Sequence, residues 1–182
     1  MPVTEQTLRA VVLEDPDGQW ELWCGRLREK PAMTADHNRF GMRLALQIGA
    51  QLDSDEFEVR VNSSRLRRPN GMNFIPDVVV VPTALVERIT NRIDILETYD
   101  PAVPFVAEVW SPSTGVYDTD TKFAEYRERG DQEIWRIHPY ERTVHVWRRQ
   151  PDGSYLETLH LGGKLTLMAL PDVTIDLDLL LR

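Results

Sequence analysis

Two acidic residues interrupt the most apolar stretches of the chain. Asp77 lies in Ile75-Pro76-Asp77-Val78-Val79-Val80-Val81, and Glu108 lies in Pro104-Phe105-Val106-Ala107-Glu108-Val109-Trp110. Because burying an unpaired carboxylate costs several kcal/mol, a cation, a metal or a raised pKa must compensate. If the two strands are neighbours, the carboxylates can share one hard cation such as Mg²⁺. The alternative is that each acid lies at a strand end, solvated or paired with an arginine.

Lys122 is the third residue that could take part in chemistry. Asp118, Lys122 and Tyr126 are spaced four apart on a predicted polar helix, so they share one face. A surface ion pair between Asp118 and Lys122 would explain the spacing equally well. However, the helix begins soon after the Glu108 strand, so a lysine on its inner face can point back at the two acids.

Several further polar residues are candidates for supporting roles. His37 lies on the apolar stripe of a long predicted helix, where a packed, hydrogen-bonded core histidine is the alternative interpretation. Glu21 flanks a turn between two aromatic residues, where an exposed strand acid is the alternative. A basic cluster precedes the Asp77 strand and can contact phosphates or form a solvated loop; it consists of Arg65, Arg67 and Arg68.

The elements that must position these residues follow from periodicity and from turn residues. Helices are expected over 4–15, from Thr34 to about Leu52, weakly within 82–101, and from Asp118 to Gly130. Strands are expected over 20–23, 26–29, 57–66, 74–81, 105–110, 133–137, 143–149, 155–161 and 164–167. The order predicts an α/β (α+β) fold with a mixed central sheet flanked by helices and a β-rich C-terminal part.

Composition limits the class of protein. The 182 residues fit a single domain over 1–182, with a helical arm over 1–18 and a β-rich extension over 143–182. No apolar run approaches the roughly 18 residues that span a bilayer, and residues 1–9 do not form a secretory signal. One cysteine, Cys24, excludes an internal disulfide framework. We therefore expect no membrane association and a cytoplasmic location.

The net charge of −8 argues against nonspecific nucleic-acid binding through the whole surface. A local basic groove remains compatible with this charge, and so does an enzyme that cuts nucleic acid. A carboxylate cluster around a metal would contribute to it. An ordinary solubility surplus explains the same charge.

Several of these residues together resemble one known family. The stretches are Pro76-Asp77, Glu108-Val109-Trp110-Ser111-Pro112-Ser113-Thr114, and the later Asp118, Lys122, Tyr126, Gly130, Glu133 and Trp135. With an early Glu-x-x-x-Gly, here Glu21 to Gly25, and His37 opening the long helix, they resemble the Uma-type restriction endonucleases. That family is a bacterial branch of the PD-(D/E)XK nuclease superfamily. The resemblance covers about residues 20–170.

The resemblance implies a restriction-endonuclease-like core and a divalent-metal site. Asp77 and Glu108 would be the ligands of Mg²⁺ or Mn²⁺, with a main-chain carbonyl such as that of Val109 completing the shell. Trp110 occupies the slot of the archetypal lysine, and Lys122 on the next helix takes its place. His37 and Glu21 would support the site, with Asp118 and Tyr126 on the lysine's helix face. The family pattern usually differs at Cys24, Trp110 and His138.

The expected function is divalent-metal-dependent hydrolysis of phosphodiester bonds in nucleic acid, with DNA as the substrate and a homodimer as the assembly. A catalytically inactive nucleic-acid- or protein-binding module on the same fold is the alternative. A carbohydrate- or peptide-binding β domain would rest only on the aromatic residues of the C-terminal third, which at strand spacing are usually core.

Overall fold

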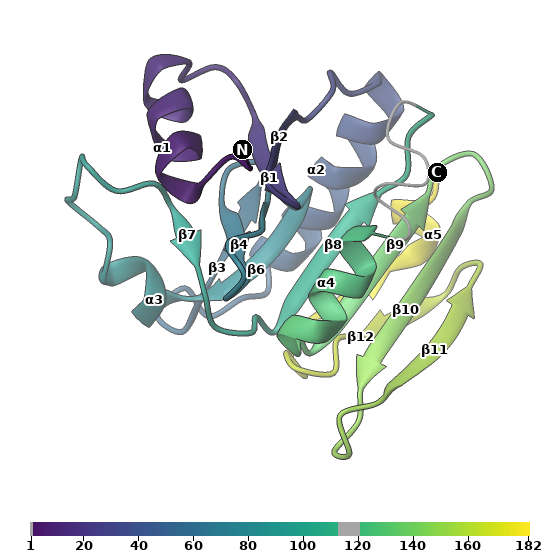
Figure 1. The fold of residues 1–182 in the computed structure, drawn as a ribbon. Coiled ribbons are helices and arrows are strands. Elements are labelled where there is room, and N and C mark those ends of the chain that lie inside the picture. Colours follow the sequence, from purple (N-terminus) through teal and green to yellow (C-terminus); the bar gives the residue numbers. More distant parts are fainter. Residues whose placement is uncertain (1, 113–120) are drawn as a thin grey trace.

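A mixed six-stranded sheet forms the centre of the fold (Figure 1). The computed structural model describes residues 2–112 and 121–182. The strand order is β11-β10-β9-β8-β6-β3, in which β8 and β9 are parallel and the other neighbours antiparallel. The bounds are β3 Phe57–Val61, β6 Val78–Pro82, β8 Phe105–Val109, β9 Glu133–His138, β10 Thr143–Arg149 and β11 Tyr155–His160. The expected mixed central sheet is confirmed.

A second, five-stranded sheet has the order β2-β1-β5-β4-β7. It comprises β1 Trp20–Trp23, β2 Arg26–Glu29, β4 Arg65–Arg67, β5 Asn73–Phe74 and β7 Thr98–Tyr99. Cys24 and Gly25 have φ of +46° and +72° and form the tight turn between β1 and β2. Helix α1 (Glu5–Glu14) covers one face of this sheet through Leu8 and Val12. The N-terminal helix is therefore packed on the body of the protein.

Both faces of the central sheet are covered, as the continuous apolar strands predicted. Helix α2 (Ala35–Gly49) packs on one face through Phe40, Leu44 and Ile48. The Thr34 hydroxyl caps α2 by accepting a hydrogen bond from the His37 N–H. Helix α4 (Lys122–Arg129) and the five-stranded sheet cover the other face. The core on that side includes Phe74, Val106 and Tyr126.

The C-terminal part of the chain contributes to the central sheet and also forms a small separate unit beside α2. Strands β10 and β11 extend the central sheet, and β11 is its edge. Strands β12 (Lys164–Thr166) and β13 (Thr174–Asp176) form a separate pair and, with α5 (Leu177–Leu180), pack beside α2. None of the described helices is long and apolar enough to cross a bilayer.

Two predicted strands are each broken in two, and both breaks lie where the chain passes from one sheet to the other. The predicted strand 57–66 is interrupted by residues 62–64, where Asn62 adopts φ +49°. The predicted strand 74–81 is interrupted at Ile75-Pro76-Asp77 because Pro76 has no N–H to donate to a ladder. The backbone N–H of Asn62 donates to the Asp77 carbonyl (3.1 Å), which ties the two crossings together.

The helix predicted weakly within residues 82–101 is mostly wrong. Only α3 (Thr83–Glu87) is helical, and β7 follows at Thr98. Ile93 is fully exposed, whereas Leu96 packs under α1. The apolar residues of this segment therefore lie in different environments and do not form one face of a helix.

The C-terminal end of α4 is fixed by a buried ion pair. Gly130 closes the helix at φ +81°, as predicted. The Arg129 guanidinium donates to the main-chain oxygens of Arg67, Tyr99, Asp100 and Pro101. It also pairs with Asp131 (3.2 Å), whose other oxygen accepts from the Val103 N–H (2.9 Å). This network sets the position of the helix that carries Lys122 and Tyr126.

Asp131 makes stability depend on pH. Burial raises the pKa of Asp131 to about 6 despite the Arg129 charge. The folded state then holds this proton more tightly than the unfolded chain, so the contribution is complete below the ordinary carboxyl pKa and is lost as the pH rises toward about 6. We expect the unfolding free energy of wild type, relative to Asp131→Asn, to fall by on the order of 2 kcal/mol across this window. Urea unfolding at several pH values measures the difference, and parallel curves for the two proteins would contradict it.

Candidate metal-dependent active site

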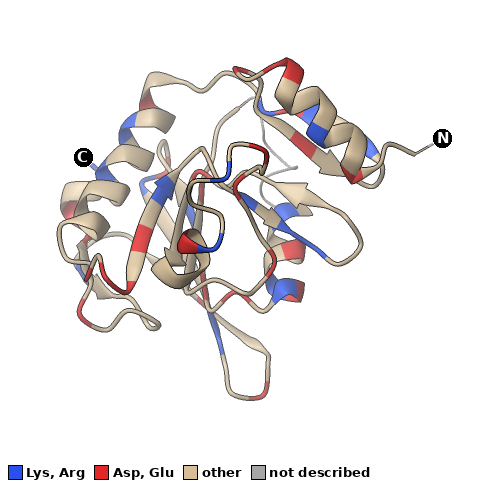
Figure 2. Cartoon of the chain, turned by 90° about the vertical axis from the view of Figure 1, so that its left-hand side faces the viewer, with Lys and Arg blue, Asp and Glu red and all other residues tan. Residues whose placement is uncertain are grey.

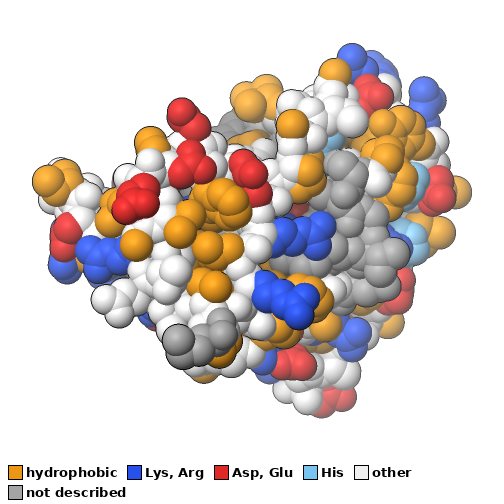
Figure 3. Space-filling model, turned by 45° about the horizontal axis from the view of Figure 1, so that its top comes forward, with side chains coloured by type: hydrophobic (Ala, Val, Ile, Leu, Met, Phe, Trp, Pro, Cys, Tyr) orange, Lys and Arg blue, Asp and Glu red, His pale blue; other side chains and the backbone are white. Residues whose placement is uncertain are grey.

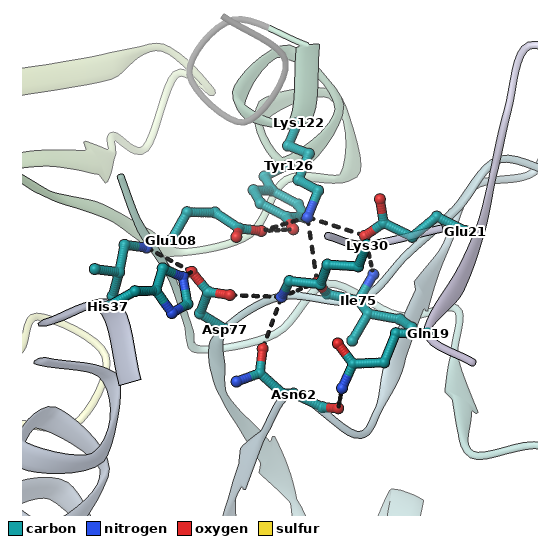
Figure 4. Close-up of polar contacts among 11 residues, drawn as sticks. Gln19, Glu21, Lys30, His37, Asn62, Ile75, Asp77, Glu108, Lys122 and Tyr126 are labelled. Carbon is teal, nitrogen blue, oxygen red and sulfur yellow. Dashed lines mark hydrogen bonds and ion pairs between the residues drawn. The ribbon is translucent and has the colours of Figure 1, made fainter. Parts of the chain in front are cut away.

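The carboxylate of Asp77 lies at the centre of a buried polar cluster (Figure 4). Its Oδ2 accepts hydrogen bonds from His37 Nε2 (2.8 Å) and from the Val109 N–H (2.6 Å). Its Oδ1 pairs with Lys30 Nζ at 2.5 Å. Strands β6 and β8 are neighbours, and their register pairs Val78 with Ala107. When this antiparallel register is continued by one residue, Asp77 lies opposite Glu108. The two acids are therefore on neighbouring strands, as the sharing of one cation requires.

Lys122 lies on the other side of the cluster, at the first residue of α4. Its Nζ is 2.9 Å from Glu21 Oε1 and 3.3 Å from Glu108 Oε1. The hydroxyl of Tyr126, one turn further along α4, donates to the same Glu108 oxygen (2.5 Å). Lys122 and Tyr126 are both fully buried, so the helix face predicted from their spacing does point back at the acids.

The peptide group of Ile75 joins the two halves of the cluster. Its carbonyl oxygen accepts from Lys30 Nζ (3.0 Å) and from Lys122 Nζ (3.2 Å). Its N–H donates to Glu21 Oε1 (2.8 Å). These main-chain groups are not used by a sheet ladder because the chain leaves β5 at Phe74 and enters β6 only at Val78. The break at Pro76 thus supplies the acceptor that both lysines need.

His37 and Asn62 position the central groups from outside. Because a carboxylate only accepts hydrogen bonds, His37 Nε2 must carry the proton it shares with Asp77. His37 Nδ1 is buried and has no hydrogen-bond partner among the described residues. Asn62 Oδ1 accepts from Lys30 Nζ (2.7 Å), and the Asn62 carbonyl accepts from the Gln19 side chain (3.0 Å).

The charges in this cluster nearly balance. Among the described residues, the carboxylates of Glu21, Asp77 and Glu108 face the ammonium groups of Lys30 and Lys122, which leaves one negative charge when His37 is neutral. Burial by itself raises the pKa of Asp77, but the Lys30 charge, the His37 hydrogen bond and the Lys122 charge lower that pKa well below its usual range. Asp77 is therefore ionised at neutral pH.

The donor chemistry fits a hard divalent cation. Asp77 and Glu108 offer carboxylate oxygens, the ligands that Mg²⁺ and Mn²⁺ prefer. The position at Asp77 Oδ1 already holds a cation, the Lys30 ammonium, so a positive charge is stable there. Among the described residues, no group of three or more His, Cys, Asp or Glu side chains is arranged to hold a metal ion. A metal at this place would therefore be held by two carboxylates, and main-chain oxygens and waters would complete its coordination shell.

The structure brings together most of the residues that the sequence singled out. Glu21, His37, Asp77, Glu108, Lys122 and Tyr126 all contribute polar groups to the cluster. Val109 contributes its N–H, whereas metal binding by its carbonyl stays a prediction. Asp118 lies outside the described residues.

The three arginines are arranged differently from the cluster expected on sequence. Arg65 is buried, and Arg67 forms a bidentate pair with Asp100 (2.6 and 2.7 Å). Arg68 is paired with Glu125 (3.2 Å) and Glu128. Acidic and basic residues are interspersed along the chain (Figure 2), and on the face in Figure 3 the described basic side chains form small groups beside acidic and hydrophobic ones. Phosphate binding by these arginines stays a prediction, and it requires Arg67 or Arg68 to exchange a carboxylate for a phosphate.

Two residues at which the chain departs from the family pattern contact each other. The Trp110 ring stacks on His138 with centroids 4.4 Å apart, and Tyr140 meets Trp110 edge-on at 5.9 Å. Tyr140 is 54% exposed. Trp110 directly follows β8, and His138 is the last residue of the neighbouring strand β9, so this aromatic group lies at the ends of these two strands.

Sequence reasoning missed Lys30 and Asn62. Lys30 directly follows β2, a strand rich in charged residues, and Asn62 lies inside a stretch that alternates like one continuous strand. Nothing in the spacing of either residue indicates the cluster. One compositional signal exists: only three of the 21 basic residues are lysine, and two of them, Lys30 and Lys122, are in this cluster.

The arrangement of a mixed sheet with acids on adjacent central strands and a lysine on the following helix is that of a nuclease-like fold. The model of the Uma2 family, described as "Putative restriction endonuclease", matches residues 4–179. The chain therefore belongs to the Uma2 family. No functionally curated protein matches the sequence.

A solved structure has the same fold. It is described as a "putative nuclease belonging to DUF820" from Anabaena variabilis, and it is 18% identical in sequence. The match covers 99% of this chain and 98% of that chain, with a TM-score of 0.76. The expected restriction-endonuclease-like core is confirmed.

We expect Lys122 to contribute strongly to stability because its ammonium group neutralises two buried acids. In Lys122→Met, Glu21 and Glu108 lose their shared ammonium, and we expect the free energy of unfolding to fall by about 3–5 kcal/mol. Adding Glu108→Gln to Lys122→Met should recover part of the loss.

Lys164→Met is the matched control because Lys164 is exposed, and it should change stability by about 0.5 kcal/mol or less. Urea unfolding compares the variants. A Lys122→Met protein as stable as Lys164→Met would show that the buried ion pairs contribute little.

Proposed function

We propose that this protein is a divalent-metal-dependent endonuclease that hydrolyses phosphodiester bonds, with DNA as its substrate. The observation that carries the proposal is the placement of Asp77 and Glu108 at matching positions of adjacent strands with Lys122 against Glu108. Family membership and the nuclease-like fold support it.

The metal is proposed to bind between Asp77 and Glu108. When bound, Mg²⁺ or Mn²⁺ lowers the pKa of a coordinated water and neutralises charge on the scissile phosphate. His37 and the Val109 N–H hold Asp77 in place through its Oδ2, and Tyr126 holds Glu108. Lys122 supplies a compact positive charge beside Glu108, suited to charge that develops on the phosphate oxygens.

DNA approaches a chain of net charge −8, so local contacts have to offset long-range repulsion. Arg67 and Arg68 are proposed as phosphate contacts. We also propose a homodimer, which would combine such local contacts from two chains. Strand β11 supports it because, within the described residues, this edge strand pairs only with β10 and exposes Leu156 and Leu159.

The proposed metal site is tested by calorimetric titration with Mn²⁺. Wild type should bind Mn²⁺ saturably, and Asp77→Asn and Glu108→Gln should each weaken binding at least about tenfold, since each removes a charged oxygen ligand. Asp172→Asn, which alters an exposed carboxylate, is the control. Because a phosphate can complete the metal shell, the titration is repeated with a short phosphorothioate oligonucleotide.

Equal binding by wild type and Asp77→Asn under both conditions would contradict the metal site. It would favour the alternative, an inactive nucleic-acid- or protein-binding module on the same fold.

A substitution at Lys122 should lower the rate of cleavage without preventing metal binding. Lys122→Met should retain Mn²⁺ binding but cleave single- or double-stranded DNA or RNA at least about a hundredfold more slowly, the size of effect seen when a transition-state charge contact is removed. Cleavage is followed on labelled oligonucleotides with Mg²⁺ and Mn²⁺. Full activity in a folded Lys122→Met protein would rule out its catalytic role.

A further inference from the structure

Lys30 holds the position on Asp77 that a metal ion would need. Its Nζ lies 2.5 Å from Asp77 Oδ1, 2.7 Å from Asn62 Oδ1 and 3.0 Å from the Ile75 carbonyl oxygen. These three acceptors match the three N–H donors of an ammonium group. Lys30 is only 6% exposed, so this side chain is held in a built pocket.

The other oxygen of Asp77 is already engaged. Asp77 Oδ2 accepts from both His37 Nε2 and the Val109 N–H, which fills its two lone pairs. A cation that binds this carboxylate must therefore approach Oδ1, where the Lys30 ammonium lies. A divalent cation bound to Oδ1 would lie within contact distance of the Lys30 ammonium, and the two positive charges would repel each other.

Lys30 also lines a surface cavity that could accommodate its ammonium group away from Asp77. This cavity, of about 360 Å³, is lined by Lys30 and Asn62 together with Asp17, Gln19 and Glu29. Lys30 and Asn62 therefore belong to both the buried cluster and the cavity wall. The carboxylates of Asp17 and Glu29 can accept an ammonium that leaves Asp77, and a lysine side chain is long and flexible enough to make that change by rotamer rearrangement.

We infer that Lys30 is a built-in cation that competes with the divalent metal for Asp77. In the metal-free protein its ammonium occupies Asp77 Oδ1, and metal binding displaces it toward the cavity lined by Asp17 and Glu29. Lys30 thereby lowers the metal affinity and keeps the acids neutralised until metal arrives. The inference rests on the proposed metal site at Asp77 and Glu108 and adds the residue that controls its occupation.

The lysine content of the chain allows a direct test on the unmodified sequence. The three lysines are Lys30, Lys122 and Lys164. Wild type is treated with an amine-acetylating reagent with and without saturating Mn²⁺, and modification is quantified for each lysine by mass spectrometry. Lys164 is exposed and should react in both conditions, whereas buried Lys122 should stay protected. Lys30 should be protected without metal and should react at least about tenfold faster with Mn²⁺.

The matched variant is Lys30→Met, which keeps a similar side-chain length without the charge, and Lys164→Met is its control. If the metal-competent arrangement is populated only about 1–10% of the time in wild type, removing Lys30 tightens Mn²⁺ binding about ten- to a hundredfold in calorimetry. Lys164→Met should bind Mn²⁺ like wild type.

The outcomes separate this inference from the proposed function. Saturable Mn²⁺ binding by wild type, with Lys30 still protected and no gain in Lys30→Met, would overturn the inference and leave the metal site standing. Binding by Lys30→Met but not by wild type would support the inference. If neither protein binds Mn²⁺, even with the phosphorothioate oligonucleotide, both the inference and the metal-dependent function are overturned.

Discussion

The carbonyl oxygen of Ile75 is the acceptor on which the buried cluster depends. It binds both Lys30 and Lys122, while the N–H of the same residue binds Glu21. Two ammonium groups converging on one oxygen repel each other unless carboxylates surround them, and Asp77 and Glu108 supply that negative charge. Because each partner is buried, removal of one charge leaves another uncompensated, and we expect such a change to lower the free energy of unfolding.

The architecture explains why such a main-chain acceptor exists at this point. The two short crossings between the six-stranded and the five-stranded sheet, at residues 62–64 and 75–77, lie next to each other, and at both of them backbone groups leave the sheet ladders. Helices α2 and α4 lie on opposite faces of the central sheet (Figure 1). Helix α2 places His37 against Asp77, and helix α4 places Lys122 against the Ile75 carbonyl oxygen. The candidate site is thus placed by the junction of two sheets.

The sequence was most informative where burial and charge conflicted. Acids inside apolar strands predicted that Asp77 and Glu108 need compensation, and helical spacing predicted that Lys122 faces them; both arrangements are found. Periodicity could not show that Pro76 divides a continuous apolar run between two sheets, because the residues on both sides remain buried. Lys30 escaped prediction for a related reason. Its partner Asp77 is 47 residues away, and no local pattern encodes a pairing that only the sheet junction creates.

Asp77 and Glu108 are neutralised by the protein's own cations, so binding of the proposed metal would exchange one positive charge for another. Anomalous diffraction from crystals grown with Mn²⁺ would show directly whether this exchange takes place. We expect one strong peak at about 2.0–2.2 Å from oxygens of both Asp77 and Glu108, with Lys30 Nζ moved away from Asp77. A manganese ion bound elsewhere, or Lys30 still paired with Asp77 beside a bound ion, would contradict it.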